Sequence, residues 1–152
     1  MKLITPSIRF RARSLRGDAA LELAFLASLM LLLLLATVEF GRVFYLSQTV
    51  ADAARAGVEY GAQSLVKAAD TNGMQQTAIN DAKNVSGVTA TAKNYCKCSN
   101  GTTVTCGDGF CATGPQLVYV EVDTSATFTT LTNFPGIPSN FPVKATAIRQ
   151  VE

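Results

Sequence analysis

A long apolar stretch dominates the N-terminal part of the chain. Between Ala19 and Val38 only three residues are polar, namely Glu22, Ser28 and Thr37. A helix of about 20 residues spans roughly 30 Å, which is the thickness of the hydrocarbon core of a bilayer. The leucine-rich centre of the stretch has no polar face, so lipid or other apolar helices must surround it. The pattern predicts a transmembrane helix over residues 18–38.

Hydrophobic residues continue beyond this stretch at steps of three and four, the spacing of one helical face. They are Phe40, Val43, Phe44, Leu46, Val50, Ala53, Ala54, Gly57, Val58, Gly61 and Leu65. Two charge pairs also have helical spacing, Glu39–Arg42 and Arg55–Glu59. No proline interrupts this region. We therefore predict one helix from about Asp18 to about Ala69, with residues 39–69 as its continuation outside the membrane.

Ala53, Gly57 and Gly61 form a ridge of small residues on this helix. A ridge with four-residue spacing lets another backbone approach closely. Two partners are equally compatible with it: a helix of a second subunit, or the sheet of the same chain.

The pattern changes after residue 69 to short segments separated by polar residues. A break at 70–73 precedes a short helix predicted over 74–84, with its apolar side at Met74, Ala78, Ile79 and Ala82. Alternating residues predict three strands, at 88–92, 117–123 and 143–151, and we expect Val118, Val120 and Val122 to face one way. Prolines make the 133–142 loop irregular. Since three strands alone are marginal, residues 70–152 should form a small α+β extracytoplasmic domain whose antiparallel sheet packs on the long helix.

Four cysteines lie within one polar loop: Cys96, Cys98, Cys106 and Cys111. An even, tight cluster outside the cytoplasm predicts two disulfides that staple a loop with little core of its own. Pairing Cys96 with Cys98 would close a very tight ring, which leaves two arrangements. The nested one, Cys96–Cys111 with Cys98–Cys106, suits a hairpin and is the one we favour. Four thiolates binding zinc are the less favoured alternative.

The charge distribution orients the chain and limits its chemistry. Residues 1–17 form a basic leader that carries Lys2, Arg9, Arg11, Arg13 and Arg16. These five positive charges exceed the net charge of +2, so the rest of the chain is acidic and no nucleic-acid surface is expected. Basic residues before the apolar stretch place the N-terminus in the cytoplasm. The chain has no histidine, and we expect neither an enzyme, a metal site nor a cofactor.

The junction of leader and apolar stretch carries the most informative motif. Gly17 is followed five residues later by Glu22, and the apolar helix starts directly after Gly17. This arrangement resembles the class III signal of the type IV pilin superfamily, which a prepilin peptidase cuts after the glycine. The resemblance implies cleavage between Gly17 and Asp18. It also implies that the Glu22 carboxylate pairs with the free amine of a neighbouring subunit and sets the register between subunits.

Further motifs narrow the resemblance to the TadE-like family of pseudopilins. The matching segments are Arg16–Glu22, Val38–Tyr45 and Ala51–Gly57, of which Glu39-Phe40-Gly41-Arg42 and Ala53-Ala54-Arg55-Ala56-Gly57 are the most specific. Residues 134–138 and 143–147 resemble the end of such proteins more weakly. Two positions differ from the usual pattern: Leu23, where an aromatic residue is common, and Asp18, where a small neutral one is usual.

The resemblance implies a minor pseudopilin of a Tad-type pilus that supports pilus assembly and adherence, biofilm formation or secretion. Its expected partners are the prepilin peptidase, other pilin and pseudopilin subunits, and membrane lipid. Its expected location is the bacterial inner membrane, with a cytoplasmic N-terminus and a periplasmic C-terminal domain, and the pilus itself. The first alternative is a single-pass anchored periplasmic binding domain that never enters a filament. The second is a module secreted by ordinary signal cleavage, although the nearest suitable site, 51–53, lies far beyond the apolar stretch.

Overall fold

The computed structural model describes residues 16–107, 111–112, 114–132, 136 and 138–151, so most of the predicted leader lies outside the described residues. Three helices and four strands follow one another along this part of the chain. They are α1 (Arg16–Ala62), α2 (Leu65–Ala69), α3 (Thr71–Asp81), β1 (Thr89–Cys98), β2 (Thr103–Val104), β3 (Gln116–Thr129) and β4 (Asn140–Gln150). The chain divides into two compact units, Met1–Val38 and Glu39–Glu152. The second unit contains the outer part of α1 and the whole sheet.

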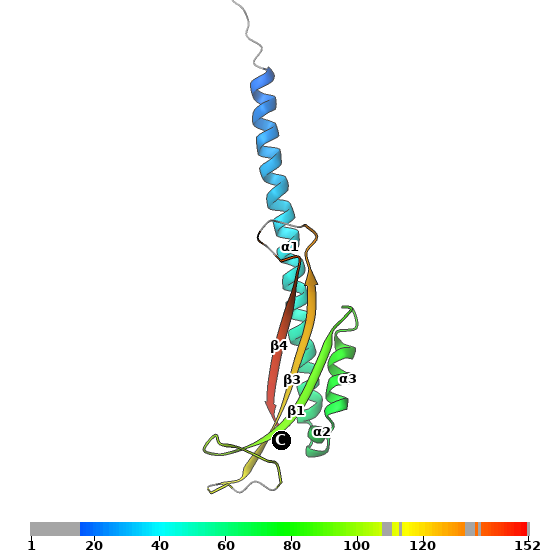
Figure 1. The fold of residues 1–152 in the computed structure, drawn as a ribbon, viewed down its shortest axis with the longest axis vertical. Coiled ribbons are helices and arrows are strands. Elements are labelled where there is room, and N and C mark those ends of the chain that lie inside the picture. The colour runs from blue at the N-terminus through cyan, green and yellow to red at the C-terminus, as the bar shows by residue number, and fades with distance from the viewer. Residues whose placement is uncertain (1–15, 108–110, 113, 133–135, 137, 152) are drawn as a thin grey trace, which may run out of the picture. The chain divides into compact units, whose positions relative to one another are not determined.

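The four strands form one antiparallel sheet in the order β2-β1-β3-β4 (Figure 1). The long strand β3 lies at its centre, with Tyr119 opposite Tyr95 of β1 and Val122 opposite Ala147 of β4. Strand β4 is an edge strand and contains Pro142, which lacks the backbone N–H that a central strand would need. The α+β fold of a long N-terminal helix on an antiparallel sheet is thereby confirmed.

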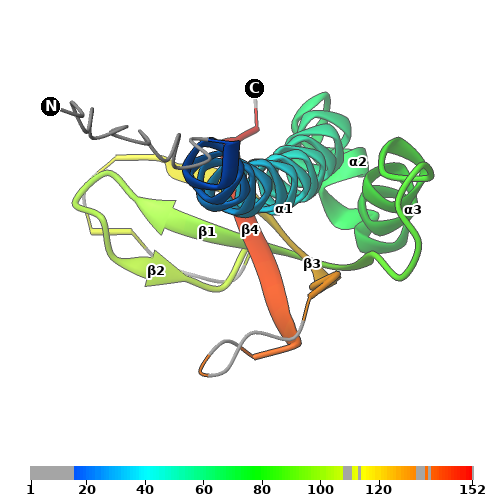
Figure 2. The ribbon, with the colours of Figure 1, turned by 90° about the horizontal axis from the view of Figure 1, so that it is seen from above.

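The core of the second unit lies between α1 and one face of the sheet (Figure 2). The helix contributes Leu46, Val50, Ala53, Ala54, Gly57, Val58, Gly61 and Ala62, all of them buried. Alternate residues of β3 meet them, namely Val120, Val122, Thr124, Ala126 and Phe128. Since side chains alternate between the faces of a strand, the other face of the sheet stays open to solvent. The expected common orientation of Val118, Val120 and Val122 fits this pattern.

The small-residue ridge of α1 packs inside its own unit. A methyl group added at Gly57 would lie 3.0 Å from the carbonyl oxygen of Met74 and 3.1 Å from the Val122 side chain. At Gly61 it would meet Met74 and, at 3.2 Å, Val120. Of the two partners that the sequence left open, the ridge therefore uses its own sheet together with α3. The short helix predicted over 74–84 is α3, which begins earlier, at Thr71, and ends at Asp81. Of its expected apolar side, Met74, Ala78 and the C-cap residue Ala82 are buried, and Ile79 is half-buried.

The long helix ends earlier than the sequence predicted. It stops at Ala62 rather than near Ala69, because the Ser64 hydroxyl accepts a hydrogen bond from Lys67 N–H and caps the separate helix α2. Serine is a preferred N-cap residue, so a signal for this break was present in the sequence. Leu65 consequently lies off the buried face, with 63% of its surface exposed.

The strands are longer than predicted. Strand β1 continues past Ala92 to Cys98, and β3 continues past Asp123 to Thr129. Strand β4 begins at Asn140 inside the segment predicted to be irregular, and the two-residue strand β2 was not predicted at all. In each case pairing with a neighbouring strand, which local sequence does not encode, extends the element.

Candidate functional site

The part of α1 that belongs to the first unit, up to Val38, exposes its apolar side chains. Leu21, Leu23 and Phe25 are each about 70% exposed, and the leucine-rich centre is at least 39% exposed throughout. By length and composition this helix is able to cross a membrane, and it is the one such helix among the described residues. An apolar surface of this size is unfavourable in water, because moving each Leu or Phe side chain from water into an apolar environment is favourable by roughly 1.5–3 kcal/mol.

The proposed processing residues lie at the beginning of this helix. Gly17 and Asp18 belong to the first turn of α1, which begins at Arg16 rather than at Asp18. A peptidase that needs an extended substrate must therefore unwind this turn, and terminal turns fray readily. Glu22 follows about one turn later and is exposed. No hydrogen-bond or ion-pair partner reaches Glu22 from the side chains that the structure describes.

An unpartnered carboxylate within an apolar helix is chemically significant. It costs free energy in hydrocarbon unless an opposite charge or a donor compensates it. Within the described part of the chain nothing supplies that compensation, so a partner outside it, such as an amine of a second subunit, fits the requirement. The structure thus leaves Glu22 available for the role predicted from the sequence, and that role stays a prediction.

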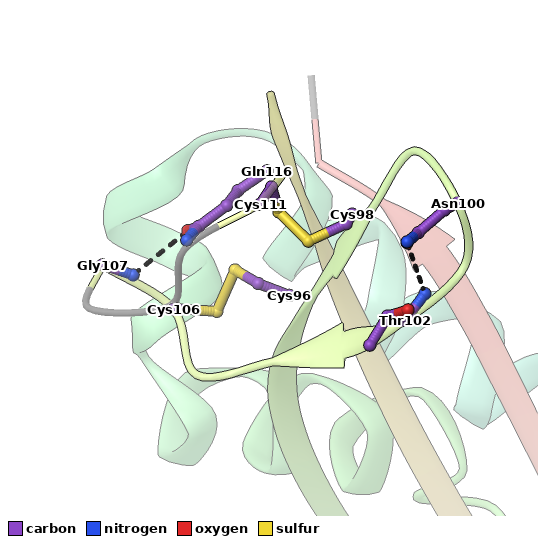
Figure 3. The surroundings of a disulfide bond; sticks show 8 residues. All are labelled: Cys96, Cys98, Asn100, Thr102, Cys106, Gly107, Cys111 and Gln116. Atoms are coloured by element: carbon purple, nitrogen blue, oxygen red, sulfur yellow. Dashed lines mark hydrogen bonds between the residues drawn. A yellow bond between two sulfur atoms is a disulfide. The ribbon is translucent and has the colours of Figure 1, made fainter. Parts of the chain in front are cut away.

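The four cysteines form two disulfides, Cys96–Cys106 and Cys98–Cys111 (Figure 3). The favoured nested pairing was therefore wrong. Strand pairing gives the reason: Cys96 lies opposite Val104, so the hairpin turns at residues 99–102 and carries Cys106 toward Cys96. Cys98 at the turn is left for Cys111, with 5.6 Å between their α-carbons. Gly101 has a positive φ of 86° in this turn, which glycine adopts without strain.

A second cluster fastens the end of the sheet to α1 at residues 39–42. Glu39 and Arg42 form the predicted ion pair at 3.1 Å. Glu39 also accepts a hydrogen bond from the backbone N–H of Leu131, and Arg42 donates to the carbonyl oxygen of Thr129 at 3.4 Å. The Arg42 guanidinium lies 5.1 Å from the centre of the Phe128 ring. We call Glu39, Arg42 and the Phe128–Leu131 segment the clamp.

The second predicted ion pair is wrong. Arg55 pairs with Asp52 at 3.3 Å, and Glu59 pairs with Arg149 of β4 at 3.7 Å. Helical spacing alone could not reveal the tertiary partner of Glu59, or the backbone groups that Glu39 and Arg42 bind in the clamp.

The open face of the sheet carries polar and aromatic side chains. Tyr95 and Tyr119 stack with their ring centres 5.8 Å apart, and the Lys97 ammonium lies 5.4 Å and 5.6 Å from those centres. Lys93 donates to Glu121 at 2.8 Å, and this hydrogen bond raises the pKa of Lys93 above its usual value. Over the residues that the structure describes, no three potential metal-ligating side chains come together.

Comparison with known protein families gives a match in the N-terminal region. The sequence pattern of the TadE-like protein family matches residues 17–59, which is under a third of the chain but contains Gly17, Glu22, the apolar helix and the two residues of α1 in the clamp. The resemblance inferred from the sequence is thereby confirmed over this region, and it associates the chain with the Tad pilus. Comparison with curated proteins and with solved structures gives no significant match.

Proposed function

We propose that this chain, whose N-terminal helix carries the TadE-like pattern, is a minor pseudopilin of a Tad-type pilus. It is made as an inner-membrane precursor with its leader in the cytoplasm and its sheet domain in the periplasm. A prepilin peptidase removes residues 1–17, and the mature subunit enters the pilus through its apolar helix. In this role it supports pilus assembly and, through the pilus, adherence or secretion.

One observation carries the proposal. The family match over residues 17–59 coincides with a helix whose apolar side chains are exposed, and Glu22, the one acid inside its apolar stretch, lacks a partner among the described side chains. A plain membrane anchor would satisfy the apolar surface with lipid, and an acid at this place would gain only a favourable interaction with the helix dipole. A helix that packs against other subunits after cleavage gains a partner for Glu22 in the new α-amine of Asp18.

Replacing Glu22 with alanine tests assembly separately from insertion. We expect Glu22→Ala to insert fully, since removing a charge lowers the insertion cost by up to roughly 2.5–3.5 kcal/mol at a helix centre and by less near an end. We also expect it to be depleted from sheared pili, because the register contact is gone. Membrane fractionation and immunoblots of the pilus fraction measure the two steps.

Ser28→Ala, on the same helix, is the matched control. Among the residues that the structure describes, the Ser28 hydroxyl donates only to the carbonyl oxygen of Phe25 on its own helix, at 2.8 Å, so both steps should proceed normally. If Glu22→Ala enters pili as well as the unmodified protein does, Glu22 has no register role and merely complements the positive end of the helix dipole. A chain that never appears in the pilus fraction is the single-pass anchored binding domain.

A further inference from the structure

Exposed apolar residues surround the clamp without being covered by the sheet. Phe40 and Phe44, one helical turn apart, are 76% and 65% exposed, and Leu131 is 66% exposed. A methyl group added at Gly41, between the two phenylalanines, would meet no atom within 4 Å. The sequence pattern had assigned Phe40 and Phe44 to the buried face of the helix, but the sheet covers neither. These three side chains therefore need another environment.

The clamp fixes the level of Leu131 along the helix. Glu39 accepts the hydrogen bond from Leu131 N–H, and Arg42 reaches the carbonyl oxygen of Thr129. Leu131 is thus held at the level of residue 39, which directly follows the apolar stretch that ends at Val38. The polar interface of a bilayer adds about 5–7 Å on each side of the hydrocarbon core, or about four helical residues. Phe40 and Leu131 fall within that depth, whereas Phe44 lies six residues, or about 9 Å, beyond Val38 and therefore outside it.

We propose that Phe40 and Leu131 form a contact surface for the lipid headgroup region at the outer side of the membrane. This inference rests on the membrane-spanning helix of the proposed function. A bilayer surrounds a spanning helix on every side, so the level of a side chain along the helix, not its direction around it, decides whether lipid reaches it. Aromatic and aliphatic side chains are favoured at this depth. The clamp thereby holds the end of the sheet at the membrane surface until the subunit leaves the membrane for the pilus.

The charges of the clamp fit the same location. Glu39 is bonded both to Arg42 and to Leu131 N–H, and only 18% of its side chain is exposed. A carboxylate near the bilayer interface is costly when bare, and here a cation and an N–H compensate it. Arg42 keeps 41% of its side chain exposed, which leaves it able to meet lipid phosphates.

The absence of tryptophan from the chain provides a direct test. Single-tryptophan variants of the full chain, Leu131→Trp and Phe40→Trp, are reconstituted in vesicles of phosphatidylcholine and phosphatidylglycerol with bromine placed at shallow acyl positions. We expect both to show blue-shifted emission and strong quenching by the shallow bromines. Val66→Trp is the water control, since Val66 is 82% exposed and lies at the other end of the second unit, in α2. It should emit as in water and stay unquenched.

Leu29→Trp, in the apolar stretch, reports the membrane span itself and should be quenched by deeply brominated lipid. Quenching of Leu29→Trp without quenching of Leu131→Trp overturns the contact surface while the span stands. Blue-shifted but unquenched emission from Leu131→Trp means that protein covers it, and this also overturns the lipid assignment. An unquenched Leu29→Trp removes the span, and with it both the contact surface and the proposed function. Intact disulfides in each variant show that it has folded.

Discussion

Two glycines show how single positions set the distance between α1 and the rest of its unit. At Gly57 the carbonyl oxygen of Met74 and the side chain of Val122 approach so closely that a β-carbon would be compressed. The backbone oxygen cannot move aside without shifting α3, so this site is the less forgiving of the two. At Gly61 the nearest atom is the Met74 sulfur, which belongs to a flexible side chain. Glycine is unfavourable within a helix, and here close packing offsets that cost.

Gly57→Ala should destabilise the folded unit despite the better helix propensity of alanine. Inserting a methyl group into a packed core costs typically 1–3 kcal/mol, whereas the propensity gain is about 1 kcal/mol. We therefore expect a net loss of up to about 2 kcal/mol. Gly41→Ala is the matched control on the same helix, because its added methyl group meets nothing, and it should be neutral or stabilising. Chemical denaturation of both variants in detergent, followed by circular dichroism, measures the difference, and equal stability would contradict this packing.

The cysteine pairing is a second claim about single residues, and peptide mapping decides it. Trypsin cuts after Lys97 and a protease specific for aspartate cuts before Asp108, so Cys96 and Cys111 lie on separate peptides and residues 98–107 carry the other two cysteines. The observed pairing predicts that all three peptides remain linked until reduction. The nested pairing would instead release residues 98–107 as an internally bonded peptide. Mass spectrometry of the unreduced digest distinguishes the two.

At the scale of elements, the corner between α1, α2 and α3 depends on one aspartate. Asp70 caps α3 by accepting the N–H of Gly73 at 2.9 Å, and its other oxygen accepts the Tyr60 hydroxyl at 2.9 Å. The hydrogen bond to Asp70 raises the pKa of Tyr60 above its ordinary value of 10.0. A β-carbon at Gly73 would collide with both partners, at 2.2 Å from Asp70 and 2.7 Å from Tyr60. The close contacts among Tyr60, Asp70 and Gly73 therefore allow only glycine at position 73.

Removing the Tyr60 hydroxyl should have an effect that depends on pH. A raised pKa means that the folded state favours the protonated phenol, so its contribution is fully present below pH 10 and is lost as the pH rises through the folded-state value. We expect Tyr60→Phe to lower the melting temperature at pH 7 and to lose this disadvantage above pH 10. Thermal melts of both proteins across this range measure it. Tyr119→Phe, whose hydroxyl makes a longer bond of 3.4 Å to Gln150, is the control and should show a smaller difference.

Sequence patterns predicted elements where the pattern was long or strictly alternating. The apolar helix and the Val118–Val122 strand were of this kind. Prediction failed where a partner strand decided the outcome: Lys93, Asn94 and Lys97 read as polar loop residues, yet β3 pairs with all of them. The side chains of Lys93 and Lys97 fit because one face of the sheet is open to water, and Asn94 lies on the other face at a position that is itself exposed. The helix break after Ala62 and the cap at Asp70 had local signals, Ser64 and Asp70 themselves, which the longer helical periodicity obscured.

At the scale of the molecule, the chain combines a helix able to span a membrane with a sheet domain stabilised by its own core and two disulfides. The candidate processing site, Gly17 and Glu22, could be recognised from sequence because its chemistry depends on spacing along one helix. The clamp could be recognised only as an ion pair, because its partners lie in β3 and the residues after it.

The central claim is that the chain is processed as a pseudopilin, and the mature N-terminus tests it most directly. Protein recovered from a host that has the cognate prepilin peptidase is analysed by intact mass and N-terminal sequencing, with Gly17→Val in parallel. The account predicts a mature chain that begins at Asp18, and a Gly17→Val variant that inserts but keeps its leader. A mature chain that still carries residues 2–16 would contradict it and leave a plain membrane anchor, and a chain beginning beyond Ala53 would indicate ordinary signal cleavage.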